Sequence, residues 1–144
     1  MKTLLSLAII FSLISLGSCK HKHGEEESSH KPEPVQLDQG KKWKADQQTN
    51  EGVAKMQDLV IAFKKDTPNP GIEDYKRLNS QLQTEMDSIF KKCAMTGDAH
   101  QQLHNFLVGV IKELNALKED DLKASEQAFS AMEKNLFSYT NYFE

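Results

Sequence analysis

Several residue types and patterns are scarce in this chain of 144 residues, which has only two cysteines, one tryptophan and four prolines. Two cysteines allow at most one intramolecular disulfide. The sequence has no alternating run of β-branched residues, so no β-strand is predicted. It contains no Gly-x-Ser-x-Gly, His-Glu-x-x-His, phosphate-binding glycine loop or dinucleotide fingerprint. Acidic residues outnumber basic ones, 21 to 18, which argues against a nucleic-acid partner. We therefore expect a protein that is not an enzyme.

The first 19 residues have the features of a bacterial export signal. Lys2 is followed by residues 4–16, LLSLAIIFSLISL, a length typical of a secretory signal and too short to span a bilayer. The stretch ends in Leu-Gly-Ser-Cys, which resembles the lipobox of bacterial lipoproteins. The resemblance implies removal of residues 1–18, a diacylglycerol on the Cys19 sulfur and a further acyl chain, such as palmitate, on the new amino terminus. Lys20 in place of an aspartate favours the outer membrane, facing either side.

Lipidation of Cys19 has a consequence for Cys93, the second cysteine. The Cys93 thiol is left without an intramolecular partner in the oxidising cell envelope, so it is buried, bound to a metal or open to another molecule. Removal of the signal takes away Lys2 and no acid, which changes the formal charge from −3 to −4. About 125 residues remain, enough for one small domain.

Residues 19–45 predict a flexible tether, because prolines, glycines and charges dominate and few apolar residues are present. His21, His23 and His30, with nearby glutamates, offer weak accessory metal ligands; a solvated spacer is the simpler interpretation. From residue 46 to 144 the apolar residues recur every three or four positions in four segments. Short connections between such segments predict an all-α, antiparallel up-down-up-down four-helix bundle. We expect the first helix at residues 47–65 and the third to begin with Asp98 as N-cap.

Topology brings the end of the second predicted helix and the start of the third to one pole of the bundle. The stretch CAMTGDAHQQLH supplies Cys93, Met95, His100 and His104 there. The two histidines are four residues apart, so they lie on one helix face. Thiolate, thioether and imidazole ligands favour copper(I), and zinc is the next candidate. Taken singly, each residue also fits a purely structural role; a free cysteine, for example, often behaves as a small core residue.

This stretch also carries a resemblance. The motifs Gly-x-Lys-Trp, at residues 40–43, and Cys-x-Met-x-Gly-x-x-His-x-x-Leu-His, at residues 93–104, are similar to those of small, uncharacterised helical bacterial lipoproteins. The resemblance groups Trp43 and Gly97 with the four candidate ligands, and it implies no established activity.

Three functions follow as hypotheses. The first is a lipid-anchored envelope protein that binds a transition metal for buffering, sensing or hand-off to an efflux system or another envelope partner. The second is a structural or partner-binding lipoprotein in which Cys93 is a core residue. The third is thiol redox chemistry at Cys93; a Cys93–His100 nucleophilic dyad is also conceivable, but no orienting third residue is evident.

Overall fold

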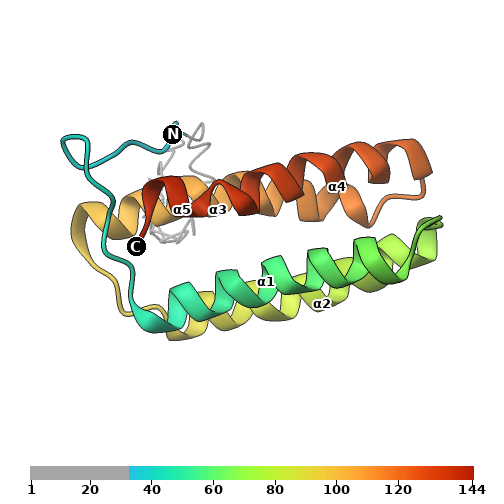
Figure 1. Cartoon of the computed structure of the whole chain (residues 1–144), viewed down its shortest axis with the longest axis horizontal. Helices are drawn as coiled ribbons and strands as arrows, with labels where there is room; N and C mark the ends of the chain where they lie inside the picture. The colour runs from blue at the N-terminus through green and yellow to red at the C-terminus, as the bar shows by residue number, and fades with distance from the viewer. Residues whose placement is uncertain (1–32) are drawn as a thin grey trace, which may run out of the picture.

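The structure is a computed structural model that describes residues 33–144. These residues form four long helices and one helical turn, namely α1 Gln47–Asp66, α2 Ile72–Lys92, α3 Gly97–Leu117, α4 Leu122–Phe137 and α5 Tyr139–Tyr142 (Figure 1). Apart from two isolated β-bridges, the described range contains no β-structure. The predicted all-α bundle is therefore confirmed. The predicted signal peptide, Cys19, and the histidines at positions 21, 23 and 30 lie outside the described residues.

The bundle consists of two antiparallel hairpins. Helices α1 and α2 form one hairpin and α3 and α4 the other, and the two lie side by side (Figure 1). Helix α1 also packs on α4, and α2 on α3. The end of α2, the start of α3, the start of α1 and α5 therefore meet at one end of the molecule, which we call the Cys93 pole.

Apolar residues spaced three and four apart on each helix fill the space between the hairpins. One stripe of buried side chains comes from each long helix, as expected for amphipathic helices that bury one face. The fully buried large side chains are Met56, Leu78, Leu82, Met86, Ile89, Leu103, Leu107, Leu114, Leu117, Met132, Leu136 and Phe143. Far from the Cys93 pole, a cluster of Phe63, Tyr75 and Phe129 joins α1, α2 and α4, with ring centroids 5.2 to 5.8 Å apart.

One glycine in each hairpin permits a close approach of its two helices. A Cβ atom on Gly52 of α1 would collide with the Ile89 side chain of α2. A Cβ atom on Gly109 of α3 would meet the side-chain amide of Asn135 on α4. Gly52 is buried beside a core residue that also borders the Cys93 pole, so this contact connects hairpin packing to the candidate site.

Residues 33–46, which we call the strap, pack on the Cys93 pole, whereas the sequence predicted a flexible tether up to residue 45. A turn with positive φ at Gln39 and Gly40 folds the strap back on itself. Beyond it, Trp43 pairs with the chain end: its N–H donates to the Tyr142 carbonyl at 2.7 Å, and its carbonyl accepts from the Glu144 N–H at 2.9 Å. The described part of the predicted tether thus belongs to the folded domain. Backbone pairing with the C-terminus is what holds it there, and local composition does not reveal such pairing.

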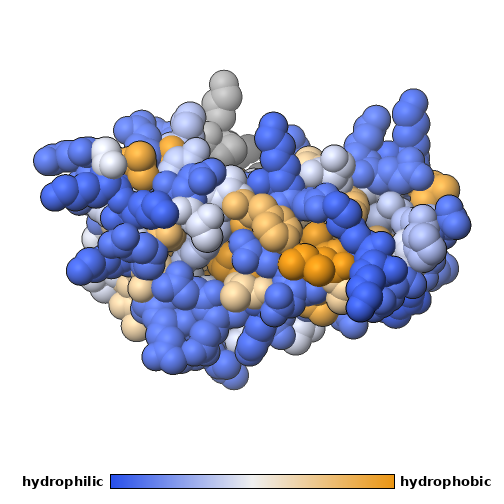
Figure 2. All heavy atoms as spheres, in the orientation of Figure 1, coloured by the Kyte–Doolittle hydropathy of each residue, from blue (hydrophilic) through white to orange (hydrophobic). Residues whose placement is uncertain are grey.

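The outer surface is largely hydrophilic. Figure 2 shows a small apolar patch in the middle of the face formed by α1 and α4, framed by hydrophilic side chains. Exposed large apolar side chains on these two helices are Ile61, Leu122 and Phe137. Among the described helices, none combines the length and the apolar character that crossing a bilayer requires.

Candidate metal centre

Helix α2 ends at Cys93, and this ending determines where the thiol lies. The Cys93 N–H still donates to the Ile89 carbonyl at 2.8 Å, but the residue itself has ψ of 124° and leaves the helix. The chain then passes through Ala94 and Met95 to Thr96, the extended N-cap of α3, and turns at Gly97, whose φ is +65°. Glycine takes this left-handed conformation without a Cβ penalty.

Helix α3 begins at Gly97, so the prediction of Asp98 as its N-cap is wrong. The left-handed Gly97 completes the turn early, and Thr96 takes the N-cap position, two residues before Asp98, without a side-chain hydrogen bond. Asp98 lies in the first helical turn instead, where the positive end of the helix dipole favours an acidic side chain.

Cys93, His100 and His104 form a chain of polar contacts. The Cys93 Sγ lies 3.6 Å from the His100 Nδ1, and the His104 Nε2 lies 2.9 Å from the His100 Nε2. The two imidazole centroids are 4.4 Å apart. His100 therefore uses both ring nitrogens, one toward the sulfur and one toward the second imidazole.

These three side chains line one pocket between the end of α2 and the first turns of α3. Its volume is about 210 Å³, and its other walls are apolar: Ile89, Phe90, Leu103 and Leu107. Phe90 is exposed and stands at the rim.

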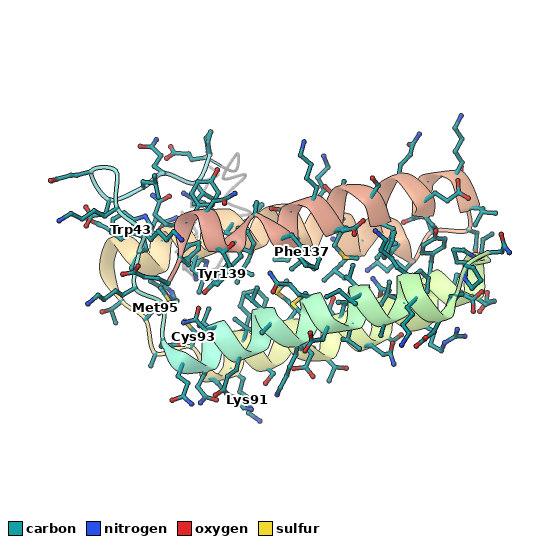
Figure 3. All side chains as sticks on the ribbon, in the orientation of Figure 1. Trp43, Lys91, Cys93, Met95, Phe137 and Tyr139 are labelled. Atoms are coloured by element: carbon teal, nitrogen blue, oxygen red, sulfur yellow. The ribbon has the colours of Figure 1, made fainter. Side chains whose placement is uncertain are left out.

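Met95 is placed differently from the other three predicted ligands. It is half-buried, packs against the hydrophobic core and does not line the pocket. Figure 3 shows Met95 and Cys93 at the same end of the bundle as Trp43 and Tyr139. Within residues 33–144, no cluster of three or more His, Cys, Asp or Glu side chains is arranged to hold a metal ion. The described geometry thus brings together two candidate ligand atoms, the Cys93 Sγ and the His100 Nδ1, and places His104 against the other ring nitrogen of His100. The four-ligand set stays a prediction.

Electrostatics keep His104 suited to accept a hydrogen bond. Burial of its ring, and secondly the neighbouring His100, lower the pKa of His104 below the ordinary value for histidine. A neutral His104 has a free lone pair, and at Nε2 it accepts a hydrogen bond from the Nε2–H of His100. That tautomer of His100 leaves a lone pair on its Nδ1, directed at the Cys93 sulfur.

The sequence did not single out two side chains at the start of α1, and the first of them holds the loop. The Asp46 carboxylate accepts a hydrogen bond from the Ala94 N–H at 2.6 Å, and its other oxygen accepts from the Thr49 N–H at 2.7 Å. Burial on its own would raise the pKa of Asp46, but hydrogen bonds from Ala94, Thr49 and Met95 outweigh it, so the pKa is lowered. An aspartate just before a helix signals an N-cap. Only the fold brings it to residue 94.

Asn50 is the second of these side chains. Its Oδ1 accepts a hydrogen bond from the Tyr139 hydroxyl at 2.9 Å. Burial, and then the nearby Asp46 and Cys93, raise the pKa of Tyr139 far above its ordinary value. The hydroxyl therefore stays protonated and remains a hydrogen-bond donor to Asn50. Lys91, by contrast, is exposed and points away from the bundle (Figure 3).

Comparison of the chain with protein-family models, with curated proteins and with solved structures finds no match. The geometry of the Cys93 pole is therefore the basis on which a function is proposed.

Proposed function

We propose that the Cys93 pole binds one transition-metal ion, with copper(I) the preferred ion and zinc the next. The observation that carries this proposal is the 3.6 Å separation of the Cys93 Sγ and the His100 Nδ1. Zinc–sulfur and zinc–nitrogen bonds of about 2.3 and 2.05 Å at a tetrahedral angle place the two ligand atoms about 3.6 Å apart. The spacing of the two atoms, which is also that of a direct hydrogen bond, therefore matches that of two ligands on one tetrahedral ion.

His104 has a supporting role in this arrangement. An ion on the His100 Nδ1 leaves the Nε2–H of the same ring to donate to the His104 Nε2, 2.9 Å away. Metal-bound histidines commonly donate their other N–H to a fixed acceptor, which orients the ring and strengthens the ligand. The lowered pKa of His104 supports this role, because only a neutral imidazole accepts the hydrogen bond.

The choice of copper(I) rests on the chemistry of the ligand atoms. A thiolate is a soft ligand and an imidazole an intermediate one, and together they favour copper(I) or zinc over calcium and magnesium. The Met95 thioether, two residues after Cys93, is kept in the proposal as a further ligand, because thioethers favour copper(I). Two protein ligands beside an open pocket leave positions for an exchanging ligand, so the site suits buffering or hand-off better than permanent structural binding.

The cellular setting belongs to the same proposal. Acylation at Cys19 anchors the protein to the cell envelope, with the outer membrane favoured, and residues 20–32 connect the lipid to the strap. A metal-efflux component or another envelope protein is the proposed exchange partner. Nucleic acid is not a partner in this proposal.

Thiol chemistry is a second candidate, which the Cys93–His100 contact favours. The His100 Nδ1 is placed to accept the thiol proton, and His104 orients the His100 ring, a role that the sequence left without an evident residue. A third candidate is a structural or partner-binding protein in which Cys93 only packs; Cys93 is half-buried against the core.

A competition titration tests the metal site. Residues 20–144, which contain the whole described bundle, are reduced and titrated with copper(I) against a competing chelator, and then with zinc. We expect one tight equivalent that is lost in Cys93→Ser and in His100→Ala. A matched variant with alanine at positions 21, 23 and 30 retains this equivalent. Binding that survives Cys93→Ser but disappears with the tether histidines contradicts the proposal.

A further inference from the structure

The Asp46 carboxylate joins two parts of the chain that are far apart in sequence. Its Oδ1 caps α1 through the Thr49 N–H, and its Oδ2 accepts from the Ala94 N–H, 48 positions away. One side chain therefore serves both as the N-cap of α1 and as the acceptor for the loop that carries Cys93.

The position of Cys93 depends on what holds the backbone on each side of it. On the preceding side, the Cys93 N–H donates to the Ile89 carbonyl of α2. On the following side, the Ala94 N–H donates a hydrogen bond to Asp46. Ala94 and Thr96 are both exposed, and Thr96 caps α3 without a side-chain hydrogen bond. Without Asp46, the Ala94 N–H loses its acceptor, and the backbone next to Cys93 is held by a hydrogen bond on the α2 side only.

We propose that Asp46 is a positioning residue that holds the Cys93 loop so that the thiol faces His100. The part of this proposal that concerns the ion site rests on the metal-binding function proposed above. The part that concerns the loop holds whether or not an ion is present. Asp46 makes no contact with the ion in this proposal; it acts through the backbone of Ala94.

The same contact connects ion binding to the strap. Asp46 ends the strap, and the preceding Ala45 donates its N–H to the Glu144 carbonyl at 2.9 Å. An ion bound at Cys93 lowers the mobility of the loop and, through the shared carboxylate, stabilises the first turn of α1. We expect slower amide exchange at Thr49 and Asn50 when the ion is added, because both N–H groups bond to Asp46.

The test compares Asp46→Ser with Asp121→Ser. Asp121 caps α4 at the opposite pole through the Ala124 N–H at 3.0 Å, so it controls for the loss of an aspartate N-cap. Serine still caps a helix, but its short side chain has a single oxygen and does not serve both partners. Two quantities are measured on residues 20–144: the copper(I) affinity, and the rate at which the metal-free Cys93 thiol reacts with a small aromatic disulfide.

We expect Asp46→Ser to weaken copper(I) binding by about 10- to 100-fold, the usual effect of losing an outer-shell contact. We also expect it to speed the reaction of the thiol, because the freed loop exposes Cys93 more often. Asp121→Ser should leave both quantities unchanged. If Asp46→Ser is not natively helical by circular dichroism, Asp46→Asn replaces it, since asparagine caps as well as aspartate but carries one acceptor oxygen.

The outcomes separate the two proposals. Equal values for the folded Asp46 and Asp121 variants overturn the positioning role of Asp46. A wild-type chain that binds neither copper(I) nor zinc overturns the metal function instead, and the rate of the thiol reaction then decides alone whether Asp46 holds the loop.

Discussion

At the scale of single residues, His100 is the centre of the candidate site because its two ring nitrogens face different partners. The sulfur lies at Nδ1 and the second imidazole at Nε2. This division gives the two histidines unequal roles, although they look equivalent in the sequence. A ligand and its hydrogen-bond acceptor differ in what their removal does to ion binding, and the difference is measurable.

We expect His104→Ala to weaken copper(I) binding by about 10- to 100-fold and not to abolish it, because the variant loses an outer contact and keeps both ligand atoms. His100→Ala should abolish tight binding. Gln101→Ala, an exposed change on the same helix, is the control. Competition titrations of the three variants give the comparison. Equal loss in both histidine variants would show that both rings bind the ion.

The titration of His104 gives a pH dependence of stability. Its pKa is lowered in the folded protein, so near and below the ordinary histidine pKa of about 6.5 the unfolded chain binds more protons than the folded one. Stability therefore falls as the pH drops through this range and is unaffected by His104 above it. Urea unfolding of the wild type and His104→Gln at pH 7.5 and 5.5 tests this. The variant should show the smaller loss, and an equal loss contradicts the assignment.

Site residues were predictable where the signal was local. The apolar stripe of α2 ends at Cys93, and a spacing of four put His100 and His104 on one face of α3; both features follow from helix geometry. The placement of Met95 against the core and the second partner of Asp46 were not predictable. Both depend on the path of a four-residue loop, and a single left-handed glycine decides that path.

At the scale of structural elements, the helices and their order were predictable. Apolar residues recur every three or four positions within each helix, and helix-breaking residues separate the helices at the observed connections. The strap was not predictable. It has few apolar residues, and it is held by backbone hydrogen bonds with the chain end, between Trp43 and residues 142 and 144. Pairing of this kind leaves little trace in composition, so the segment was predicted as part of a tether.

The two glycine contacts predict opposite responses to the same substitution. Gly52→Ala pushes a Cβ into the buried Ile89 side chain and should destabilise the protein by about 1–3 kcal/mol. Gly109→Ala meets only the end of the Asn135 side chain, which can rotate away, so the gain in helix propensity of up to about 1 kcal/mol should dominate. Urea unfolding measures both variants. Equal destabilisation would show that the Asn135 side chain does not rotate away from a Cβ at residue 109.

The contribution of the strap is tested at Trp43. This half-buried side chain packs on the core, and its Nε1–H donates to the Gln36 carbonyl at 2.6 Å. We expect Trp43→Ala to lower the free energy of unfolding by about 2 kcal/mol, roughly half the cost of truncating a fully buried tryptophan. Trp43→Phe, which keeps the apolar contact, should lose less. Unfolding is followed by circular dichroism, because the chain has no other tryptophan. No change in Trp43→Ala would mean that the strap adds nothing to the fold.

At the scale of the whole molecule, the bundle places its one thiol at the pole where the strap also packs. In the proposed envelope setting, the lipid and the ion site are therefore connected by a short chain: residues 20–32, the strap, Asp46 and the Cys93 loop. The strap is tied to α3 as well, since the Gln36 N–H donates to the Gln102 side chain at 2.8 Å.

Anchoring through Cys19 is tested separately from metal binding. We expect the full chain, expressed in a bacterium with a lipoprotein pathway, to incorporate labelled palmitate and to sediment with membranes, because several acyl chains hold it there. Cys19→Ser should lose both the label and the membrane association. Cys93→Ser is the matched control, since it removes the other sulfur and should retain both. Label that follows Cys93, or membrane association that persists in Cys19→Ser, would contradict lipid anchoring at residue 19. It would leave the copper(I) titration of residues 20–144 unaffected, so the two proposals stand or fall independently.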